Sequence, residues 1–419
     1  MTNGPKRSLL LAAAISAVLT WPFAAGTAAL QQRSSEARWI TAWGSSQQSL
    51  GPTAMTNSTV RMIARVTIGG DAVRIRLANT FGTTPLTIRK VYVGQRVQGA
   101  AIVPGSNRQV LFKGSEAVSV PPGGGVESDA VPMKVLARED LAVSLYIPDT
   151  DVRPSQHTGA VVTSYLTPNG SGDAAADETR TPFAATTTSM FWLKAIDVRS
   201  ASSTGAIVGF GDSITDGTCT TLDAHDRWQD WLAMRLNLAD PHRGAAASHK
   251  AVVNEGIGGN SATRENLQPP ADSTPGVERL DRDVLAHQGV THVVVFMGTN
   301  DLRRGAPPRQ VIAGLQDIIT RVKARGLKVI GVTIIPRHNV VASGTNTGWN
   351  DAKSKSRHEV NQWIRTKAPF DAVIDFDKVV RDPAHADLIY ASFNCDGIHP
   401  NPRGYYEMGT SLSLDLFAR

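Results

Sequence analysis

Ser213, Asp396 and His399 have the side-chain types that acyl transfer requires. Ser213 lies in the segment GFGDSITDG (209–217), directly after the apolar run 206–208, and is therefore expected at the end of a buried strand. A serine hydroxyl is a weak nucleophile at neutral pH, but an imidazole can take its proton and later pass it to a leaving group. Asp396 precedes His399 by three residues and can hold the far ring nitrogen. We therefore predict Ser213 as nucleophile, His399 as base and Asp396 as the residue that orients the base.

Two further turns offer hydrogen-bond donors for the charge that develops during acyl transfer. Each follows an apolar run, and their sequences are GIGGN (256–260) and GTND (298–301). The tetrahedral intermediate needs donors that are already aimed at its oxygen. Gly259 can offer its backbone N–H at close range because it has no side chain, and Asn300 can add an amide. Together with the backbone N–H of Ser213, they form the predicted oxyanion hole. The neighbouring residues are interpreted as structural, with Gly211, Gly258 and Gly298 as turn formers and Asp212 as a helix cap.

After about residue 203, continuous apolar runs alternate with amphipathic stretches. Strands are predicted at 206–210, 250–254, 291–297, 328–335 and 372–376, and helices near 226–238, 276–288, 307–325, 351–367 and 403–417. Apolar strands separated by amphipathic helices predict a parallel sheet covered on both faces. Ligands of such sheets bind beyond the carboxyl ends of the strands, where the three glycine-containing turns converge.

Residues 38–165 show a different pattern, with period-two alternation and punctuation by glycine and proline. The runs 60–68 and 73–77 are interpreted as a hairpin that turns at 69–71 and has one dry face. Further strands are predicted at 87–93, 109–112, 117–120 and 141–147. Many short strands without a helix predict a β-sandwich, with a jelly roll as the expected form. The stretch 167–188, rich in Ala, Thr, Asp and Gly, is interpreted as an exposed, flexible loop or linker.

The second half of the chain resembles the SGNH, or GDSL-type, serine hydrolase family. The matching blocks are GDSIT (211–215), NEGIGGN (254–260), GTND (298–301) and DGIHPNPRGY (396–405). The resemblance implies the same nucleophile, base, orienting acid and oxyanion donors as the residue-by-residue reading. It also implies a flavodoxin-like three-layer αβα domain of the α/β class. Ile214 stands where the family name has leucine, which leaves the chemistry unaffected.

An additional β-domain before the hydrolase half resembles a branch of secreted SGNH proteins grouped with acetylxylan and other carbohydrate esterases. The segments that carry this likeness are WGS (43–45), VRIRLAN (73–79) and SD (128–129). We accordingly place a β-domain at 37–190 and the hydrolase domain at 203–419. Trp349 and Arg303 are candidate substrate-binding residues, Trp349 for stacking on a sugar or aromatic group and Arg303 for meeting an acidic substituent. A structural role for Trp349, in which it closes the edge of the core, is an equally supported alternative.

Three other functional motifs match the sequence in part, but each lacks a required residue. The nucleophile turn lacks the glycine two places after serine that marks the α/β-hydrolase elbow. The turn at 256–261 misses the last position of a dinucleotide fingerprint. His358-Glu359 begins like a zinc-protease helix, but Gln362 stands where the second histidine belongs. We therefore predict neither cofactor nor metal.

The composition and the N-terminus suggest an exported protein. The segment 1–29 has Lys6 and Arg7, an apolar core at 9–19 and small residues at 24–29, as in a signal peptide for secretion or export to the periplasm. No apolar run is long enough for a stable membrane span. The formal net charge is +6, but the basic residues are scattered among acids, which argues against nucleic acid binding. The sequence gives no oligomeric state.

The chain has two cysteines, Cys219 and Cys395, an even number that suits one disulfide in an exported protein. Cys219 follows Ser213 closely and Cys395 directly precedes Asp396, so assembly of the catalytic residues would bring the thiols together. We hypothesise a bridge between the nucleophile loop and the acid–base loop. The alternative is a pair of unpaired buried thiols.

These observations predict a serine esterase that cleaves carboxylic esters through an acyl-enzyme. Because the sequence shows no long amphipathic lid, short-chain or acetyl esters, especially on carbohydrate, are the expected substrates. A lipase, thioesterase or arylesterase of broad scope is an alternative, since fold and family do not fix the acyl group. A carbohydrate-binding protein of the same fold is a further one. The β-domain is either a binding module or a wall of the catalytic crevice, to which the stretch 157–158 would contribute.

Overall fold

The computed structural model describes residues 1, 2, 4, 36–239, 249–337 and 349–418. Contacts divide the chain into Met1–Ser35 and a second compact unit, Glu36–Arg419, which contains every described helix and strand. The predicted signal segment lies outside the described residues, apart from its positions 1, 2 and 4. Among the described residues, no helix has the length and apolar character needed to cross a bilayer.

A parallel sheet occupies the C-terminal half, as the apolar runs predict. Its strands are β18 (Gly205–Gly211), β19 (Lys250–Gly256), β20 (Val290–Phe296), β21 (Lys328–Val332) and β22 (Ala372–Ile374). They lie in the order β19-β18-β20-β21-β22. From β18 the chain first adds β19 on one side and then adds β20 and the later strands on the other side, as in flavodoxin-like sheets. Gly211 pairs with Gly256 on one side and with Phe296 on the other. The three turns with candidate residues therefore leave the sheet at the same edge.

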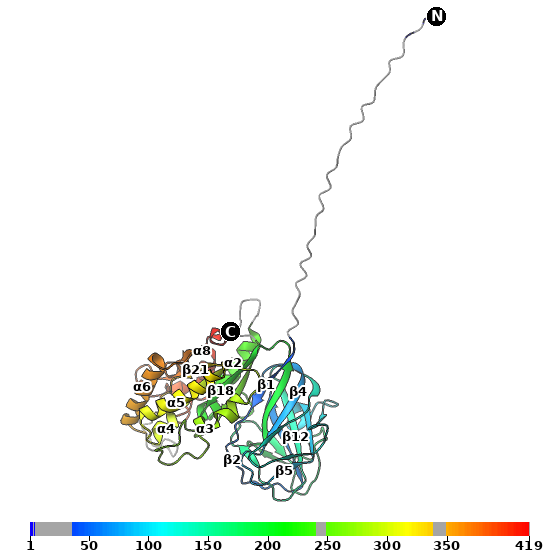
Figure 1. The fold of residues 1–419 in the computed structure, drawn as a ribbon, viewed down its shortest axis with the longest axis horizontal. Helices are drawn as coiled ribbons and strands as arrows, with labels where there is room; N and C mark the ends of the chain where they lie inside the picture. The colour runs from blue at the N-terminus through cyan, green and yellow to red at the C-terminus, as the bar shows by residue number, and fades with distance from the viewer. Residues whose placement is uncertain (3, 5–35, 240–248, 338–348, 419) are drawn as a thin grey trace. The chain divides into compact units, whose positions relative to one another are not determined.

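Helices cover both faces of this sheet and form a three-layer arrangement (Figure 1). The helices are α1 (Ser213–Asp216), α2 (Trp228–Leu238), α3 (Gly276–Leu280), α4 (Thr299–Arg303), α5 (Pro308–Ala324), α6 (Asp351–Thr366), α7 (Phe376–Val380) and α8 (Pro402–Ser411), with the π-helical turn η2 (Asp281–Leu285) and the 3-10 turns η3 (Ala391–Phe393) and η4 (Leu414–Phe417). Alternate strand residues point to opposite layers: Ile207 packs with α2, α7 and α8, whereas Val208 packs with α5 and α6. The expected αβα architecture is confirmed.

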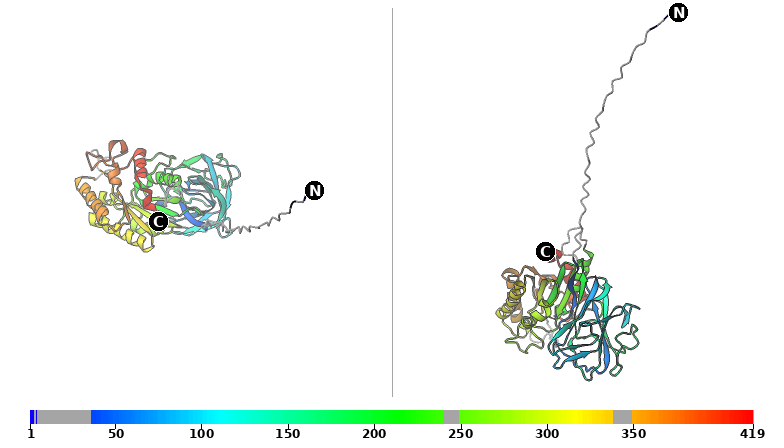
Figure 2. Two further views of the ribbon diagram at one scale, coloured as in Figure 1. Left: turned by 90° about the horizontal axis from the view of Figure 1, so that it is seen from above. Right: turned by 45° about the vertical axis from the view of Figure 1, so that its right-hand side comes forward.

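The N-terminal half is built from antiparallel strands (Figure 2). Their bounds are β1 (Arg38–Gly44), β2 (Ser49–Leu50), β3 (Ser58–Arg65), β4 (Gly70–Ala78), β5 (Leu86–Ile88), β6 (Lys90–Gln98), β7 (Ala101–Ile102), β8 (Arg108–Val110), β9 (Val118–Val120), β10 (Gly125–Glu127), β11 (Val131–Val135), β12 (Asp140–Ile147), β13 (Ser155–His157), β14 (Ser164–Leu166), β15 (Ala185–Thr187), β16 (Met190–Phe191) and β17 (Leu193–Ser200). The two larger sheets run β1-β17-β4-β10, with β11 beside β4, and β15-β14-β3-β12-β6-β7, with β8 beside β6. Their apolar residues share one core.

The predicted hairpin at residues 60–77 is wrong. Strand β3 pairs with β12 and β14, whereas β4 pairs with β17, β10 and β11, so the two strands belong to different sheets. Both strands do have the dry face that the alternation predicts, and both contribute it to the shared core. Period-two alternation identifies a buried face but carries no information about which edge a strand pairs with. The chain at 66–69 therefore crosses between sheets, although its glycines suggested a tight turn.

Most residues of the stretch 167–188 are exposed, as expected from its composition, but the stretch is anchored to the sheets. It contains β15, Ala175 within it has no exposed surface, and the buried Arg61 donates to the carbonyls of Ala100 (2.6 Å) and Asp177. The stretch is therefore a largely exposed segment that is held in place by a few buried contacts. The antiparallel half also extends past residue 190, because β17 is hydrogen-bonded between β1 and β4.

The antiparallel half and the parallel sheet share one continuous apolar core, to which Ile40 and Val208 both belong. Buried polar contacts cross the same junction. Lys194 Nζ lies 3.1 Å from Glu255 and 2.9 Å from Asp283, and all three side chains are nearly or completely buried. Removing one partner of a buried ion pair typically costs about 3–5 kcal/mol, because the other charge is left uncompensated. The two halves are therefore held together by packing and by charge.

Candidate active site

Ser213 begins α1 directly after the carboxyl end of β18. Asp212 is the N-cap of this helix, and its side chain accepts a hydrogen bond from the Ile214 backbone N–H at 3.0 Å, as the sequence predicts. Gly217 ends the helix with φ of 106°, a conformation that favours glycine. The cap and the terminating glycine together fix a single helical turn, which presents the Ser213 side chain at the sheet edge.

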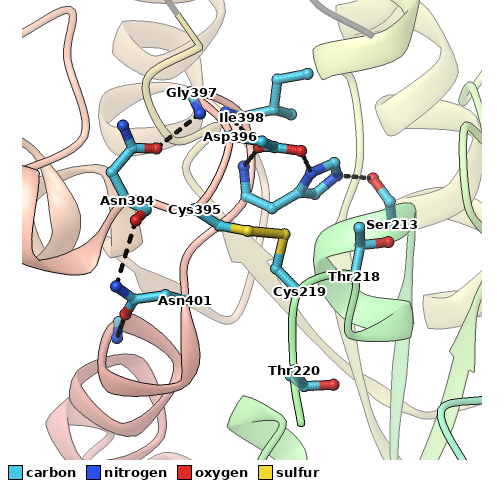
Figure 3. The surroundings of a disulfide bond; sticks show 12 residues. Ser213, Thr218, Cys219, Thr220, Asn394, Cys395, Asp396, Gly397, Ile398 and Asn401 are labelled. Atoms are coloured by element: carbon cyan, nitrogen blue, oxygen red, sulfur yellow. Dashed lines mark hydrogen bonds and ion pairs between the residues drawn. A yellow bond between two sulfur atoms is a disulfide. The ribbon is translucent and has the colours of Figure 1, made fainter. Parts of the chain in front are cut away.

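The structure brings Ser213, His399 and Asp396 into one hydrogen-bonded row (Figure 3). His399 Nε2 lies 2.8 Å from Ser213 Oγ, and His399 Nδ1 lies 2.8 Å from Asp396 Oδ2. Because the carboxylate accepts a hydrogen bond from Nδ1–H, Nε2 is the nitrogen that accepts a hydrogen bond from the serine hydroxyl. Ser213 and His399 are each 7% exposed, so the row is shielded but still reachable from solvent.

The loop that carries the acid and the base is fixed by its own hydrogen bonds. Asp396 Oδ1 accepts from the backbone N–H groups of Ile398 and His399, both at 2.9 Å. Partial burial disfavours the Asp396 charge, but the bonds from the His399 ring and these amides outweigh it and lower the pKa of Asp396 to about 2. The carboxylate is therefore ionised throughout the neutral range and is able to hold a protonated imidazole.

A disulfide joins Cys219 to Cys395, as hypothesised from the positions of the two cysteines (Figure 3). It connects the loop after α1 with the residue that precedes Asp396, across a sequence separation of 176. The backbone N–H of Cys395 also donates to the His399 carbonyl at 3.0 Å. The bridge therefore ties the segment that carries the candidate base to the segment that carries the candidate nucleophile.

The predicted oxyanion donors come from neighbouring strand ends. Gly259 has φ of 72°, in the left-handed region, and its N–H has no acceptor among the described residues. The preceding Gly258 donates its N–H to Asp216 Oδ2 at 3.0 Å. Asn300 Nδ2 donates to the Asn260 carbonyl at 3.0 Å, which links the third turn to the second. Ser213, at the first helical position, has an N–H without an intrahelical acceptor.

Two buried arginines, not identified from the sequence, tie these turns together. Arg279 donates to the carbonyls of Gly211 (2.8 Å) and Glu255 (2.9 Å) and to Asn260 Oδ1 (3.0 Å). Arg337 donates to Asn300 Oδ1 at 3.1 Å, and burial lowers its pKa to about 9. The sequence contains a signal for Arg337, because it follows β21 as the other site residues follow their strands. It contains none for Arg279, which lies within helix α3.

Two buried carboxyl groups brace the same region. Asp301 accepts from the backbone N–H groups of Ala262 (2.8 Å) and Thr263 (2.9 Å), which fixes the chain beyond the second turn. Burial raises the pKa of Asp301 to about 6 and that of Asp212 to about 7. Neither carboxyl lies in the row formed by the serine, histidine and Asp396, so their perturbed pKa values arise from structural burial.

The two candidate substrate-binding residues lie next to Arg337 and Lys353. Trp349 donates Nε1–H to Ser354 Oγ at 3.2 Å, and the Arg337 guanidinium lies 5.7 Å from its ring centroid. The Arg303 carbonyl accepts from Lys353 Nζ at 2.6 Å. Both residues are partly buried. The segment 338–348, directly before Trp349, lies outside the described residues.

One group of possible metal ligands occurs among the described residues, and it overlaps this site. Cys219 Sγ, an Asp396 oxygen and a His399 nitrogen lie within 4.8 Å of one another. The Cys219 sulfur is bonded to Cys395 and so cannot act as a thiolate, which is the form that binds metals. The remaining two groups already bond to each other. The arrangement thus suits proton transfer and nucleophilic attack.

The part of the chain that carries the site is similar to known proteins. Residues 210–406 match the GDSL-like Lipase/Acylhydrolase family. Solved structures with similar folds include a carbohydrate acetylesterase from Sinorhizobium meliloti (18% identity, TM-score 0.38) and an aryl esterase from M. smegmatis (17%, 0.38). Each match covers 49% of this chain and 95% of the other chain. A GDSL-like lipase from Bacteroides thetaiotaomicron is similar over 49% of this chain and 84% of its own (18%, 0.34). The search of curated proteins found no match.

Proposed function

Since residues 210–406 of this chain belong to the GDSL-like lipase/acylhydrolase family, we propose that the protein is a serine esterase that works through an acyl-enzyme. The single observation that carries the proposal is the row formed by Ser213, His399 and Asp396, with 2.8 Å at both of its hydrogen bonds. A nucleophile, a base and an orienting carboxylate within hydrogen-bond reach are the parts that acyl transfer needs.

In the first half of the proposed reaction, Ser213 Oγ attacks the ester carbonyl carbon while its proton moves to His399 Nε2. The charge of Asp396 stabilises the imidazolium that forms. The tetrahedral intermediate then collapses, the bond to the alcohol oxygen breaks, and His399 gives its proton to the departing alcohol. In the second half, water attacks the acyl-enzyme and loses its proton to His399. The bond between the acyl carbon and Ser213 Oγ then breaks, His399 returns the proton to Ser213 Oγ, and the acid is released.

The proposed oxyanion hole consists of the backbone N–H groups of Ser213 and Gly259 and the side-chain amide of Asn300. The strands that precede these donors pair so that their carboxyl ends lie at one edge of the sheet. The donors are therefore in position before the substrate arrives. Donors that need no rearrangement stabilise the developing charge most, and losing one typically costs about 2.7–4 kcal/mol of barrier. The proposal therefore assigns most of the electrostatic stabilisation to a preformed part of the fold.

For the substrate, we favour short-chain or acetyl esters of carbohydrates. Arg337 donates to Asn300, and Arg303, Lys353 and the Trp349 ring lie close to Arg337. Cations and one aromatic ring suit a hydroxyl-rich or acidic alcohol group better than a long hydrocarbon chain. In this proposal Trp349 stacks on a sugar ring, and Arg303 binds an acidic substituent. A lipase, arylesterase or thioesterase is the alternative within the same chemistry.

We further propose that the antiparallel half is a jelly-roll-like sandwich whose role is to support the catalytic half. The shared core and the buried Lys194 ion pairs favour this role over an independent binding module. Retention of the full-length Ser213→Ala protein on insoluble polysaccharide tests the point. Under the supporting role, retention depends on the catalytic crevice and is lost with Trp349→Ala. Binding that persists in this double variant would favour the module.

Export to the periplasm or the medium is part of the same proposal. The N-terminal segment has the composition of a signal peptide, and the Cys219–Cys395 disulfide suits an oxidising compartment. Mass determination of protein recovered from the medium or periplasm of an expressing bacterium would test it, with cleavage near residue 29 as the expected result. Recovery of only uncleaved protein inside the cell would argue against export.

The decisive test of function compares the protein without residues 1–29 with its Ser213→Ala variant. Hydrolysis of p-nitrophenyl acetate, butyrate and octanoate is measured, together with acetate release from acetylated xylan. We expect the highest kcat/KM on acetyl esters and loss of turnover in the variant. A preference for octanoate would support the lipase alternative. Absence of turnover in the unmodified protein would contradict the esterase proposal and favour a carbohydrate-binding protein.

A further inference from the structure

His157, from strand β13 of the antiparallel half, lies against the helical turn that begins with Ser213. The histidine is 4% exposed. Its Nε2 lies 3.0 Å from Asp216 Oδ1, and its Nδ1 lies 2.8 Å from the Ser46 carbonyl. The other Asp216 oxygen, Oδ2, accepts the Gly258 backbone N–H at 3.0 Å. Gly258 directly precedes the candidate oxyanion donor Gly259, so a chain of hydrogen bonds leads from β13 to the oxyanion hole.

The chemistry of the contacting atoms fixes how many protons this chain holds. The Ser46 carbonyl is an acceptor only, so His157 Nδ1 must carry a proton. The Asp216 carboxylate is also an acceptor, and its Oδ2 is already engaged by Gly258. A hydrogen bond between His157 Nε2 and Asp216 Oδ1 therefore needs a second proton on the ring. The arrangement is satisfied by an imidazolium that bridges two acceptors.

Loss of the second proton would disrupt this arrangement. Without the second proton, the Nε2 lone pair would face the Asp216 carboxylate inside the protein, where an unpaired polar contact is costly. Asp216 would then turn away from the histidine and release or shift the Gly258 N–H. Because Gly258 and Gly259 are adjacent peptide units, a rotation at one changes the direction of the next N–H. The oxyanion hole would lose alignment, while the nucleophile row would stay intact.

We propose that His157 is a positioning residue for the esterase reaction, which as a bridging imidazolium holds Asp216, and through it the Gly258–Gly259 turn, in the geometry that binds the oxyanion. The inference rests on the proposed function for its catalytic consequence. It gives the antiparallel half a specific part in catalysis through its own residue His157. The geometry of the bonds does not depend on the identity of the ester.

Other charged groups surround the pair, and they determine how its proton is held. Burial opposes the charge on His157, but Asp216 outweighs it and raises the pKa of the histidine. Arg227 works in the other direction and also donates to the Asp216 carbonyl at 2.6 Å. A cavity of about 70 Å³ adjoins both residues, and its other titratable or charged lining groups are Arg65, His225, Arg227 and Asp230. Burial lowers the pKa of His225 to about 4, so it is neutral there and does not compete for the proton.

The sign of the pH dependence follows from the raised pKa of His157. A raised histidine pKa means that the bridging state is fully present below the unfolded value near 6.5 and is lost as the pH rises through the folded value. We therefore expect an alkaline fall in kcat that originates at His157. The base His399 acts in the opposite direction, because it must be unprotonated to accept the serine proton. The two histidines are thus required in opposite protonation states.

The variants His157→Phe and His157→Gln test the proposal in the protein without residues 1–29. Phe removes both donors, and we expect kcat to fall by about 10- to 100-fold with little change in KM, the size typical of a misaligned site. Gln keeps an uncharged donor, so it should restore part of kcat and flatten the alkaline limb. The matched control is His358→Gln, which breaks the exposed pair of His358 and Asp387 (2.8 Å) far along the chain and should leave kcat and its pH profile unchanged.

A second readout works without any ester. Imidazole ¹⁵N NMR of the Ser213→Ala protein, with the His157 signals assigned by their loss in Ser213→Ala/His157→Gln, should show two N–H groups on this ring at pH 6 and a titration above 6.5. A ring with one N–H at pH 6 would overturn the proposal even if the protein proves to be an esterase. An alkaline limb that persists unchanged in folded His157→Gln would overturn it as well. If the unmodified protein has no turnover but the NMR result holds, the proposed function fails and the bridge stands.

Discussion

Arg337 Nη1 donates a hydrogen bond to Asn300 Oδ1 over 3.1 Å. Because a guanidinium has donors only, the atom facing it must be the amide oxygen. The amide nitrogen therefore points the other way, where Nδ2 donates one hydrogen to the Asn260 carbonyl at 3.0 Å. Its second hydrogen can bind an oxyanion. This contact thus sets the direction of the one side-chain donor in the proposed oxyanion hole.

Asn300→Ala should lower kcat by about 10²- to 10³-fold with little change in KM, because a donor that acts mainly on the developing charge is removed. Asn300→Asp should lose at least as much, since a carboxylate has no hydrogen to offer and repels the oxyanion. Steady-state kinetics on p-nitrophenyl acetate give the answer. Asn266→Ala removes an exposed amide that bonds to Gln310 (3.1 Å) and is the control. A rise in KM alone for Asn300→Ala would contradict the assignment.

Arg337→Met should lower kcat by about tenfold, because the Asn300 amide is then free to rotate. The double variant with Asn300→Ala distinguishes this effect from general damage to the fold. If Arg337 acts through Asn300, adding Arg337→Met to Asn300→Ala should cost almost nothing further. Additive losses would mean that Arg337 acts on the substrate or on stability instead. Thermal unfolding of each variant identifies the second case.

Loss of the Cys219–Cys395 disulfide should destabilise the folded state by about 2–4 kcal/mol, because the unfolded chain is no longer cross-linked. Cys219→Ser, Cys395→Ser and the double variant should show equal losses in urea unfolding. A reductant should shift the unmodified protein to the same value and leave the double variant unaffected. If the bridge also holds the acid–base loop in place, loss of the bridge should lower kcat as well. This decrease should be seen at urea concentrations below the unfolding transition, where the protein is still folded. Unchanged unfolding under reductant would show that the bridge contributes nothing measurable.

Much of the site was predictable because parallel sheets gather their strand ends. Ser213, Gly259 and Asn300 each follow an apolar run, and the register that pairs Gly211 with Gly256 and Phe296 brings them to one edge. The helices near 308–324 and 351–366 were predictable from their amphipathic period. Helices α1, α4 and α7 were not, since a helix of four or five residues has no period to detect.

The contacts between the two halves could not be predicted from the sequence. His157 looked like one residue of a possible wall, and nothing near it in sequence indicated a partner at Asp216. Arg279 was equally hidden, because a buried arginine in a helix resembles a surface one until its acceptors are known. The pairing of β3 and β4 was predicted wrongly for a related reason. Local patterns report which face of an element is buried, whereas partners that are distant in sequence depend on the tertiary fold.

Asp212→Asn should change how stability depends on pH. Burial raises the pKa of Asp212 to about 7, above the value near 3.9 expected in the unfolded chain. The folded state therefore holds a proton that the unfolded state releases, and stability falls as the pH rises from about 4 to about 7, by up to about 1.4 kcal/mol for each pH unit. Asparagine keeps an oxygen to accept from Ile214 N–H but has no proton to lose.

The variant should accordingly gain stability over the unmodified protein at pH 7.5 and show a smaller difference at pH 4.5. Urea unfolding at both pH values measures this, with Asp223→Asn, a change at an exposed carboxylate that accepts from Thr163, as the control. Asp301 has a raised pKa as well, so part of the slope should remain in Asp212→Asn. An equal effect of Asp212→Asn at both pH values would mean that the cap, and not the buried proton, determines the contribution of this residue.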